Sequence, residues 1–269
     1  MAKPLVTDEL WALIEPYIPV KPRRTRHPGR KPLPDRACLS GIIFVLVSGI
    51  PWEMLPQEMG CGSGMTCWRR LRDWQEAGVW ETIHRILLNK LRQADQIDFR
   101  RCAVDSATLR AGGGGEATGP SPVDRRKPGS KHHLLTDGNG VPIVAKTTAA
   151  NRHDVTQILE LVNEVPAISG VRGAPRYRFD ELYADRGYDS EPVRQALREV
   201  GMEPHIARRN TEHGSGLGVY RWVVERTLSW LHQFRRLRIR YERRLDIHQA
   251  FLIIGCVLIC HRILENPLC

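Results

Sequence analysis

The chain has 269 residues, with 40 Lys and Arg against 30 Asp and Glu and a formal net charge of +10. This length is enough for a large core in one or two domains, and the basic excess favours a polyanionic partner such as nucleic acid. The two most apolar runs, 41–50 and 250–260, are too short to cross a bilayer, and no signal peptide pattern is visible, so we expect no membrane association.

The seven cysteines are odd in number and mostly lie inside apolar runs. Such usage is typical of reduced core thiols and indicates a reducing cytoplasm. Cys256, Cys260 and His261 have helical spacing that could serve a metal site, but no second ligand pair accompanies them. Core packing is therefore the favoured interpretation of these three residues.

The first 95 residues predict a bundle of helices. The third helix has an apolar side and an arginine side, a layout shared by helix-turn-helix DNA readers and by other small bundles with a charged face. We predict a small all-α, helix-turn-helix-like domain over 1–95, in which that arginine side contacts DNA through Arg69, Arg70 and Arg72. The predicted helices are 8–15 with Thr7 as N-cap, 35–48 between Pro34 and Gly49, 67–77 capped by Thr66, and 80–91.

A basic, proline-rich arm over 21–36 separates the first two helices. It contains seven cations, four prolines and one glycine, a composition that cannot pack into a core. Two interpretations are equally favoured: a solvated linker, or an extended arm that follows phosphates or enters the minor groove. In the second case the DNA contacts are Arg24, Arg26, Arg30 and Lys31.

Beyond residue 95 the pattern changes to alternating strands and helices. This order predicts an α/β fold, a mixed sheet flanked by helices, over 96–269. A mobile basic loop over 111–130 would present Arg125, Arg126 and Lys127. The predicted elements are strand 101–104, a hairpin of 133–136 and 141–145, helix 155–165 capped by Asp154, strand 181–184, helix 191–200, strand 204–207, a helix around 221–230 and an apolar helix 247–264.

The helix around 221–230 contains one glutamate in arginine-rich surroundings. Its helical spacing predicts a core-facing stripe of Trp222, Val223, Leu228 and Leu231, and a second face with Arg221, Glu225 and Ser229. Taken alone, Glu225 is best explained as a surface ion pair with Arg221. Cations at and after this helix are predicted to hold the DNA backbone: Arg221, Arg226, Arg235, Arg236, Arg238 and Arg240.

Two further carboxylates change the interpretation of Glu225. Asp105 and Asp185 each follow a short apolar strand, and residues just past neighbouring strand ends meet in one crevice of a sheet. Singly, each aspartate is better explained as a cap or turn residue. Three converging carboxylates would repel one another, and divalent cations would compensate them, with Mg²⁺ or Mn²⁺ favoured by oxygen ligands. Together they predict a site where two ions activate a phosphodiester.

The segments 104–108 (VDSAT), 183–189 (YADRGYD) and 221–226 (RWVVER) resemble the three catalytic blocks of bacterial insertion-sequence transposases of the DDE type. The N-terminal part resembles the helical domain that precedes the RNase H-like catalytic core of that family. The resemblance implies that Asp105, Asp185 and Glu225 are the metal-binding triad and that Arg221 is the family's arginine. The family's tyrosine and lysine positions are occupied by Gly218 and His232.

The resemblance implies a transposase that binds the terminal inverted repeats of its element, cleaves a strand with two Mg²⁺ (or Mn²⁺) ions and transfers it to target DNA. It also implies a homodimer or larger synaptic assembly on double-stranded DNA, in the nucleoid of the bacterial cytoplasm, with no organic cofactor. Two alternatives stay open: an RNase H-like nuclease without strand transfer, and a non-catalytic DNA-binding regulator.

Overall fold

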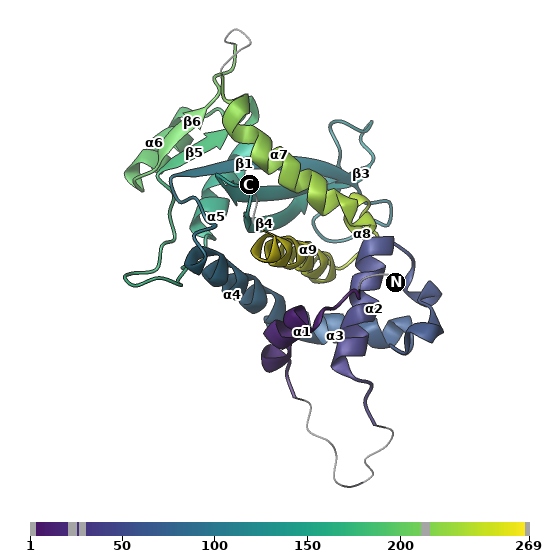
Figure 1. The fold of residues 1–269 in the computed structure, drawn as a ribbon. Helices are drawn as coiled ribbons and strands as arrows, with labels where there is room; N and C mark the ends of the chain where they lie inside the picture. The colour runs from purple at the N-terminus through teal and green to yellow at the C-terminus, as the bar shows by residue number, and fades with distance from the viewer. Residues whose placement is uncertain (1–3, 21–25, 27–30, 211–215, 267–269) are drawn as a thin grey trace.

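A mixed β-sheet forms the centre of the protein, with helices packed against it and the N-terminal helices grouped at one end (Figure 1). The computed structural model describes residues 4–20, 26, 31–210 and 216–266. Buried side chains from Val6 to Ile263 belong to one hydrophobic cluster. The N-terminal helices and the sheet therefore share a core.

The N-terminal helices begin and end mostly where local sequence signals indicate. They are α1 (Asp8–Ile14), α2 (Asp35–Ser48), α3 (Gly64–Glu76) and α4 (Val79–Gln93). Thr7 caps α1 as predicted, because its hydroxyl accepts a hydrogen bond from Leu10 N at 3.2 Å. The predicted Thr66 cap of α3 is wrong. Ser63 Oγ accepts from Thr66 N at 3.3 Å, so α3 begins three residues before the predicted start at 67.

The connection between α2 and α3 is longer than the tight turn of a helix-turn-helix reader. Gly49, with φ of 73°, ends α2 in the left-handed conformation that glycine adopts without strain. Two short 3₁₀ turns follow, η2 (Trp52–Met54) and η3 (Gln57–Met59). The helix α3 packs against α2, α4 and the C-terminal helix α9 (Leu245–Glu265). One side of α3 is thus committed to the core.

The sheet has the RNase H-like arrangement expected from the sequence. Three long strands are antiparallel: β1 (Arg101–Arg110), β3 (Pro128–Asp137) and β4 (Pro142–Ala149). Two short strands, β5 (Glu181–Ala184) and β6 (Glu203–Ile206), continue the sheet parallel to β1. The order is β4-β3-β1-β5-β6, and the two-residue β2 (Gly119–Pro120) pairs with the start of β3.

The strand β1 is much longer than the predicted 101–104. It pairs with β5 only as far as Ala103 opposite Tyr183, but its pairing with β3 continues to Arg110 opposite Gly129. Asp105 therefore lies within a strand and not after one, which corrects the prediction. It still lies just past the last residue pair between β1 and β5, so it remains near the carboxyl end of β5. The predicted loop 111–130 also contains β2 and the first residues of β3.

Helices and short turns surround the sheet. The prediction that Asp154 caps a helix over 155–165 is wrong: Asp154 starts the 3₁₀ turn η4 and its carboxylate binds side chains from two strands. The apolar, arginine-bearing segment forms α7 as expected. The remaining elements are η4 (Asp154–Thr156), α5 (Ile158–Asn163), η5 (Arg186–Tyr188), α6 (Glu191–Glu199), α7 (Gly218–Gln233) and α8 (Arg235–Arg238).

The C-terminal helix α9 lies between the sheet and the N-terminal helices (Figure 1). Phe251 of α9 stacks on Trp52 with ring centroids 5.7 Å apart. By length and composition α9 could cross a membrane, but 78% of its apolar window is buried in the protein, as in a core helix. Cys256 and Cys260, both on α9, are buried free thiols. The four other described cysteines, elsewhere in the chain, are also buried and free. Cys269 lies outside the described residues.

Candidate active site

Asp105 lies at the centre of the candidate site. Its side chain is 19% exposed, and its Oδ1 accepts a hydrogen bond from Ser106 N at 2.8 Å. The pKa of Asp105 is raised from 3.8 to about 6: burial is the largest cause, the Ser106 N–H and Arg221 act to lower it, and the negative charges of Asp185 and Glu225 act to raise it. The three acidic residues named by the sequence therefore interact electrostatically in the fold.

Asp185 is held by the turn that follows β5. It is the N-cap of η5, where its Oδ1 accepts from Gly187 N at 2.8 Å. The next carboxylate, Asp189, fixes that turn: it accepts from Arg194 Nη1 and from Arg209 N, both at 2.6 Å. Arg194 is buried and also donates to Ile206 O at 2.9 Å, so the turn is attached to β6. Asp185 thus lies on a turn that these hydrogen bonds attach to α6 and β6.

Glu225 reaches the site from α7, which packs on β1. Its side chain is 56% exposed, and its Oε1 lies 3.4 Å from Arg221 Nη2. The same Arg221 nitrogen lies 4.0 Å from Asp105 Oδ2. The guanidinium of Arg221 therefore bridges Asp105 and Glu225, and the surface ion pair expected for Glu225 alone is present together with the carboxylate grouping.

The carboxylates have the chemistry of a divalent metal site. Carboxylate oxygens are preferred donors for Mg²⁺ and Mn²⁺, and a cation would compensate both the burial of the Asp105 charge and its repulsion by Asp185 and Glu225, which together raise the pKa of Asp105. Among the residues that the structure describes, no group of three or more His, Cys, Asp or Glu side chains is close enough to hold one ion. The three carboxylates are the type of ligand that such an ion prefers. In this structure Glu225 forms an ion pair with Arg221.

Comparison with known proteins identifies the family. The family described as "Transposase DDE domain" matches residues 97–260, and "Putative transposase of IS4/5 family" matches residues 6–84. The "Putative transposase for insertion sequence element IS402" of Burkholderia cepacia is 60% identical over 167 residues, 62% of this chain and 77% of that protein. The chain belongs to the IS4/5 family of DDE transposases.

More distant relatives of the transposase are also found. The "Transposase for insertion sequence element IS1106" of Neisseria meningitidis serogroup B is 31% identical over 126 residues, 43% of this chain and 40% of that protein. The crystal structure of the catalytic domain of Mos1 mariner transposase is 12% identical and covers 66% of this chain and 89% of that chain, with a TM-score of 0.26. At that TM-score the likeness adds nothing to the fold described above.

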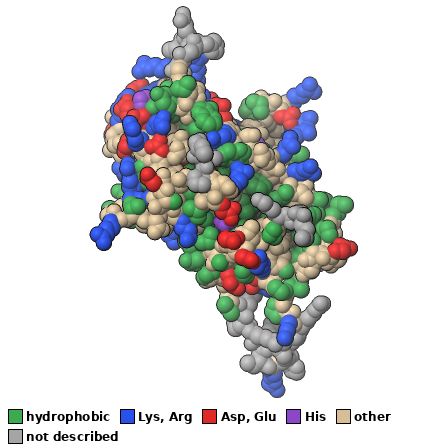
Figure 2. Space-filling model, in the orientation of Figure 1, with side chains coloured by type: hydrophobic (Ala, Val, Ile, Leu, Met, Phe, Trp, Pro, Cys, Tyr) green, Lys and Arg blue, Asp and Glu red, His purple; other side chains and the backbone are tan. Residues whose placement is uncertain are grey.

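The cations predicted to contact DNA fall into distinct groups in the transposase. Figure 2 shows Lys and Arg side chains around the outer edge of one face, on the side of α6 and over the loops beside β3. Arg24 and Arg30 of the arm lie outside the described residues. The exposed candidates are Arg26, Lys31, Arg69, Arg125, Arg126, Lys127, Arg235 and Arg238.

Two of the predicted DNA contacts are wrong. Arg236 and Arg240 are buried, at 5% and 1% exposure. Arg236 pairs with Glu242, with Nη2 at 2.6 Å from Oε1, and Arg240 donates to the backbone carbonyl of Glu242 at 2.9 Å. Buried cations are retained where such partners satisfy them, so both arginines serve the fold.

Several arginines of α3 and α7 form ion pairs, hydrogen bonds or ring contacts within the protein. Arg70 pairs with Asp35 at 3.3 Å and Arg72 with Asp73 at 2.7 Å, which leaves Arg69 as the exposed arginine of that trio. The predicted core position of Trp222 is wrong, because its side chain is 49% exposed. The guanidinium of Arg226 lies 4.5 Å from the ring centroid of Trp222 and donates to Asn139 O.

Three residues near the carboxylates were missed by sequence reasoning about the site. They are Ser106, Asp154 and Tyr188. Burial raises the pKa of Tyr188, and the charges of Asp154, Asp105 and Asp185 raise it as well. Ser106 lies in the motif segment 104–108 and Tyr188 in the motif segment 183–189. Their place in these segments was the sequence signal that could have indicated a role at the site. His232, which occupies the position of the family lysine, packs against His132 of β3, with ring centroids 5.6 Å apart.

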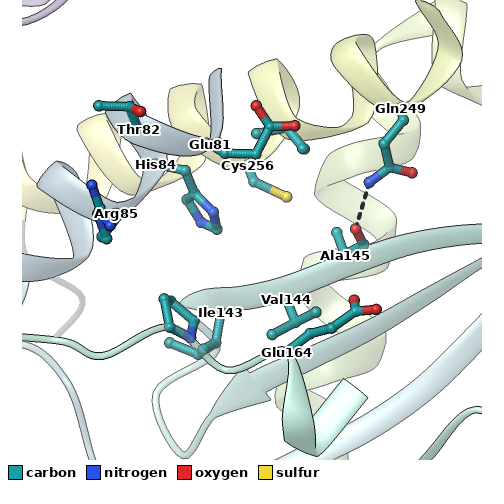
Figure 3. Close-up of a pocket in the computed structure, with 12 residues that line it drawn as sticks. Glu81, Thr82, His84, Arg85, Ile143, Val144, Ala145, Glu164, Gln249 and Cys256 are labelled. Atoms are coloured by element: carbon teal, nitrogen blue, oxygen red, sulfur yellow. Dashed lines mark hydrogen bonds between the residues drawn. The ribbon is translucent and has the colours of Figure 1, made fainter. Parts of the chain in front are cut away.

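A separate cavity of about 420 Å³ lies where α4, β4 and α9 meet (Figure 3). Its lining includes the apolar side chains of Ile143, Val144 and Ile253 and the charged side chains of Glu81, Arg85 and Glu164. The buried His84 also lines it, with Nε2 2.8 Å from Pro142 O. None of the three candidate carboxylates lines this cavity, so the site chemistry lies elsewhere.

Proposed function

We propose that Asp105, Asp185 and Glu225 bind divalent metal, with two Mg²⁺ or Mn²⁺ ions as the expected set, and cleave a phosphodiester at the end of the insertion sequence. The observation that supports this most is that the three carboxylates interact in the fold: the pKa of Asp105 is raised to about 6, chiefly by burial, and the charges of Asp185 and Glu225 contribute to the increase. A protein retains such an unfavourable group where it has chemical use. DDE transposases use divalent metal ions, which agrees with this donor set.

Each side chain has its own part in the proposed chemistry. Bound ions would polarise the phosphate and favour deprotonation of the attacking hydroxyl. Asp105 and Asp185, on a strand and an anchored turn, fix where the scissile phosphate is held. Arg221, which is 17% exposed and bridges Asp105 and Glu225, holds those carboxylates in place and supplies positive charge beside the phosphate. The same site would first hydrolyse the element's end and then join its 3′-hydroxyl to target DNA.

The exposed cations would hold double-stranded DNA across this site. Arg235 and Arg238 line a hollow of about 380 Å³ together with Ser48, Gly49, Ile239 and Tyr241. Arg125 and Arg126 have φ of 47° and 59°, a costly conformation for arginine, in a turn closed by a hydrogen bond from Lys127 N to Asp124 O at 2.8 Å. This turn would present three consecutive cations to phosphate.

The wider organisation follows from the same proposal. Residues 1–95 would act as the DNA-binding part and 96–269 as the catalytic part, fused through the core that α9 shares with α3 and α4. Joining two element ends requires two active sites, so we propose a dimer or larger assembly in the synaptic complex. The transposase would work on the nucleoid in the bacterial cytoplasm.

Terminal-repeat DNA tests the proposal directly. The protein is incubated with labelled end DNA and Mg²⁺ or Mn²⁺, with EDTA as the metal control. Cleavage should be lost in Asp105→Ala, Asp185→Ala and Glu225→Ala and retained in Glu58→Ala, which removes an exposed carboxylate of η3. Undiminished cleavage in one of the first three variants removes that residue from the proposed set.

Products from the same reaction distinguish the alternatives. Joined end and target strands support transposition chemistry, whereas cleaved ends without joined strands indicate a nuclease. Specific end binding with no metal-dependent product indicates a non-catalytic regulator.

A further inference from the structure

A chain of hydrogen bonds leads from Asp105 to Lys131. Ser106 N donates to Asp105 Oδ1 at 2.8 Å, and the hydroxyl of the same Ser106 donates to Asp154 Oδ1 at 2.7 Å. Lys131 Nζ then donates to both oxygens of Asp154, at 3.0 and 3.1 Å. These hydrogen bonds join β1, the turn η4 and β3. They attach the strand that carries Asp105 to a fixed charge pair.

The Asp154–Lys131 pair is satisfied within the protein. Lys131 is 7% exposed, and its ammonium also donates to Arg152 O at 2.9 Å. A lysine this buried requires a partner, and Asp154 supplies it. Asp154 differs from Asp105, because Asp154 has a cation at hydrogen-bond distance whereas Arg221 Nη2 lies 4.0 Å from Asp105 Oδ2. It is suited to hold a neighbour in place.

The same turn supports the second aspartate. The turn η4, which begins with Asp154, packs against η5, which begins directly after Asp185. Tyr188 at the end of η5 is 1% exposed. Its phenol is beside Ser106 and within electrostatic reach of Asp105, Asp154 and Asp185. One turn therefore contacts the supports of both aspartates.

We propose that Asp154 is a positioning residue, which holds Asp105 through the Ser106 hydroxyl and Asp185 through the packing of η4 on η5. This inference rests on the proposed function of the two aspartates. Groups hydrogen-bonded behind metal ligands fix the orientation of those ligands, and small displacements of reacting groups have large effects on rate.

A purely structural role for the charge pair makes a different prediction. If Lys131 and Asp154 only stabilise the fold, the hydroxyl of Ser106 is dispensable, because the ion pair is complete without it. If Asp154 positions Asp105, the Ser106 hydroxyl is the link that transmits the effect. Ser106→Ala removes that link and leaves both the Ser106 N–H and the ion pair in place.

The test compares Ser106→Ala and Asp154→Asn with wild type. Thr156→Ala is the matched control, because Thr156 Oγ1 donates to His153 O at 2.7 Å within the same turn and does not reach β1. Two quantities are measured: the single-turnover cleavage rate on saturating terminal-repeat DNA, and Mn²⁺ binding to the free protein by calorimetry. Thermal unfolding of each variant shows whether it is folded.

We expect Ser106→Ala to fold, to cleave about tenfold to a hundredfold more slowly than wild type and to bind Mn²⁺ more weakly. Ser106→Thr, which retains the hydroxyl, should restore both quantities, and Thr156→Ala should match wild type. The double variant Ser106→Ala/Asp154→Asn should be no slower than the slower single variant, because both changes break one link.

Several results would overturn the inference. Wild-type cleavage and Mn²⁺ binding in Ser106→Ala would show that the hydroxyl does not transmit any effect, as would equal losses in Thr156→Ala. If wild type binds Mn²⁺ but does not cleave end DNA, the proposed function fails while the calorimetry still decides the positioning role. A wild-type protein that neither binds Mn²⁺ nor cleaves overturns both.

Discussion

Two groups of charged side chains in this transposase are compensated differently. In the first, the side chains of Arg236 and Glu242 are 6% and 3% exposed and joined at 2.6 Å, and His248 Nδ1 lies 3.6 Å from Glu242 Oε2. In the second, the guanidinium of Arg221 lies 4.0 Å from Asp105 and 3.4 Å from Glu225, and the charge of Asp185 also acts on Asp105. In the first arrangement one guanidinium pairs with one carboxylate, whereas in the second burial and the charges of Asp185 and Glu225 raise the pKa of Asp105. Stability and chemistry are therefore expected to respond in opposite ways to mutation at the two places.

The largest expected effect is at Asp105, where one substitution should lower the cleavage rate and raise the stability of the fold. Asp105→Asn should lower the end-cleavage rate by about a thousandfold or more, because a neutral amide cannot replace a carboxylate ligand. In EDTA at pH 8 the same variant should be more stable than wild type, by on the order of 1–3 kcal/mol. Cleavage assays and urea unfolding measure the two quantities.

The sign of the stability effect follows from the raised pKa of Asp105. Between pH 3.8 and about 6 the folded protein holds this proton more tightly than the unfolded chain, so wild-type stability falls as the pH rises through that window. The advantage of Asp105→Asn should therefore grow over the window and remain constant above it. A variant that is less stable than wild type at pH 8 would contradict the contrast between the two places.

The next largest effect is a loss of stability at Arg236. Arg236→Met leaves Glu242 buried without its partner and removes the hydrogen bond from Arg236 Nη1 to Ile50 O at 2.9 Å. We expect a loss of about 3–5 kcal/mol in the free energy of unfolding. Arg238→Met is the matched control two residues away, and at that exposed position the change should stay within about 0.5 kcal/mol. Equal effects in the two variants would remove the distinction between buried and exposed arginines.

These two neighbouring arginines also show what the sequence could predict. The helix α2 (Asp35–Ser48) was predicted at both ends, because Pro34 and Gly49 are local signals. The burial of Arg236 depends on Glu242 and on carbonyls of residues 49 and 50, far away in the chain, so composition alone indicated a DNA contact.

The candidate site was predictable to a similar degree. The three carboxylates were named from the motif segments and the predicted strand ends, and the charges of Asp185 and Glu225 do act on Asp105 in the fold. The length of β1 was missed because its second half is polar and is held by pairing with β3, which no local pattern records. The role of Asp154 was missed for the same reason: its partners Ser106 and Lys131 lie on two strands.

A smaller effect, on the pH dependence of stability, is expected from His84. Burial lowers the pKa of His84 to about 4, so between pH 6.5 and 4 the unfolded chain binds the proton more tightly than the folded protein. This histidine therefore contributes a loss of stability as the pH falls through that window, of on the order of 1–3 kcal/mol in total. In His84→Gln the fall between pH 6.5 and 4, measured by urea unfolding, should be reduced by that amount. His153→Gln, at an exposed histidine, should leave the fall unchanged, and equal pH profiles for wild type and His84→Gln would contradict the prediction.

The smallest expected effect is on DNA affinity at the exposed arginines. It distinguishes Arg235 and Arg238 from the buried Arg236 and Arg240 in the same segment. Arg235→Ala and Arg238→Ala should leave the free energy of unfolding within about 0.5 kcal/mol of wild type. Each should reduce the slope of log affinity for double-stranded DNA against log salt concentration by about 0.9, if each arginine neutralises one phosphate. Arg244→Ala is the control, since Arg244 is 48% exposed but already pairs with Asp246 at 2.6 Å, and the slope should stay close to that of wild type. Fluorescence anisotropy at several salt concentrations measures these slopes. Unchanged slopes in Arg235→Ala and Arg238→Ala would place the DNA path away from the hollow that these two residues line.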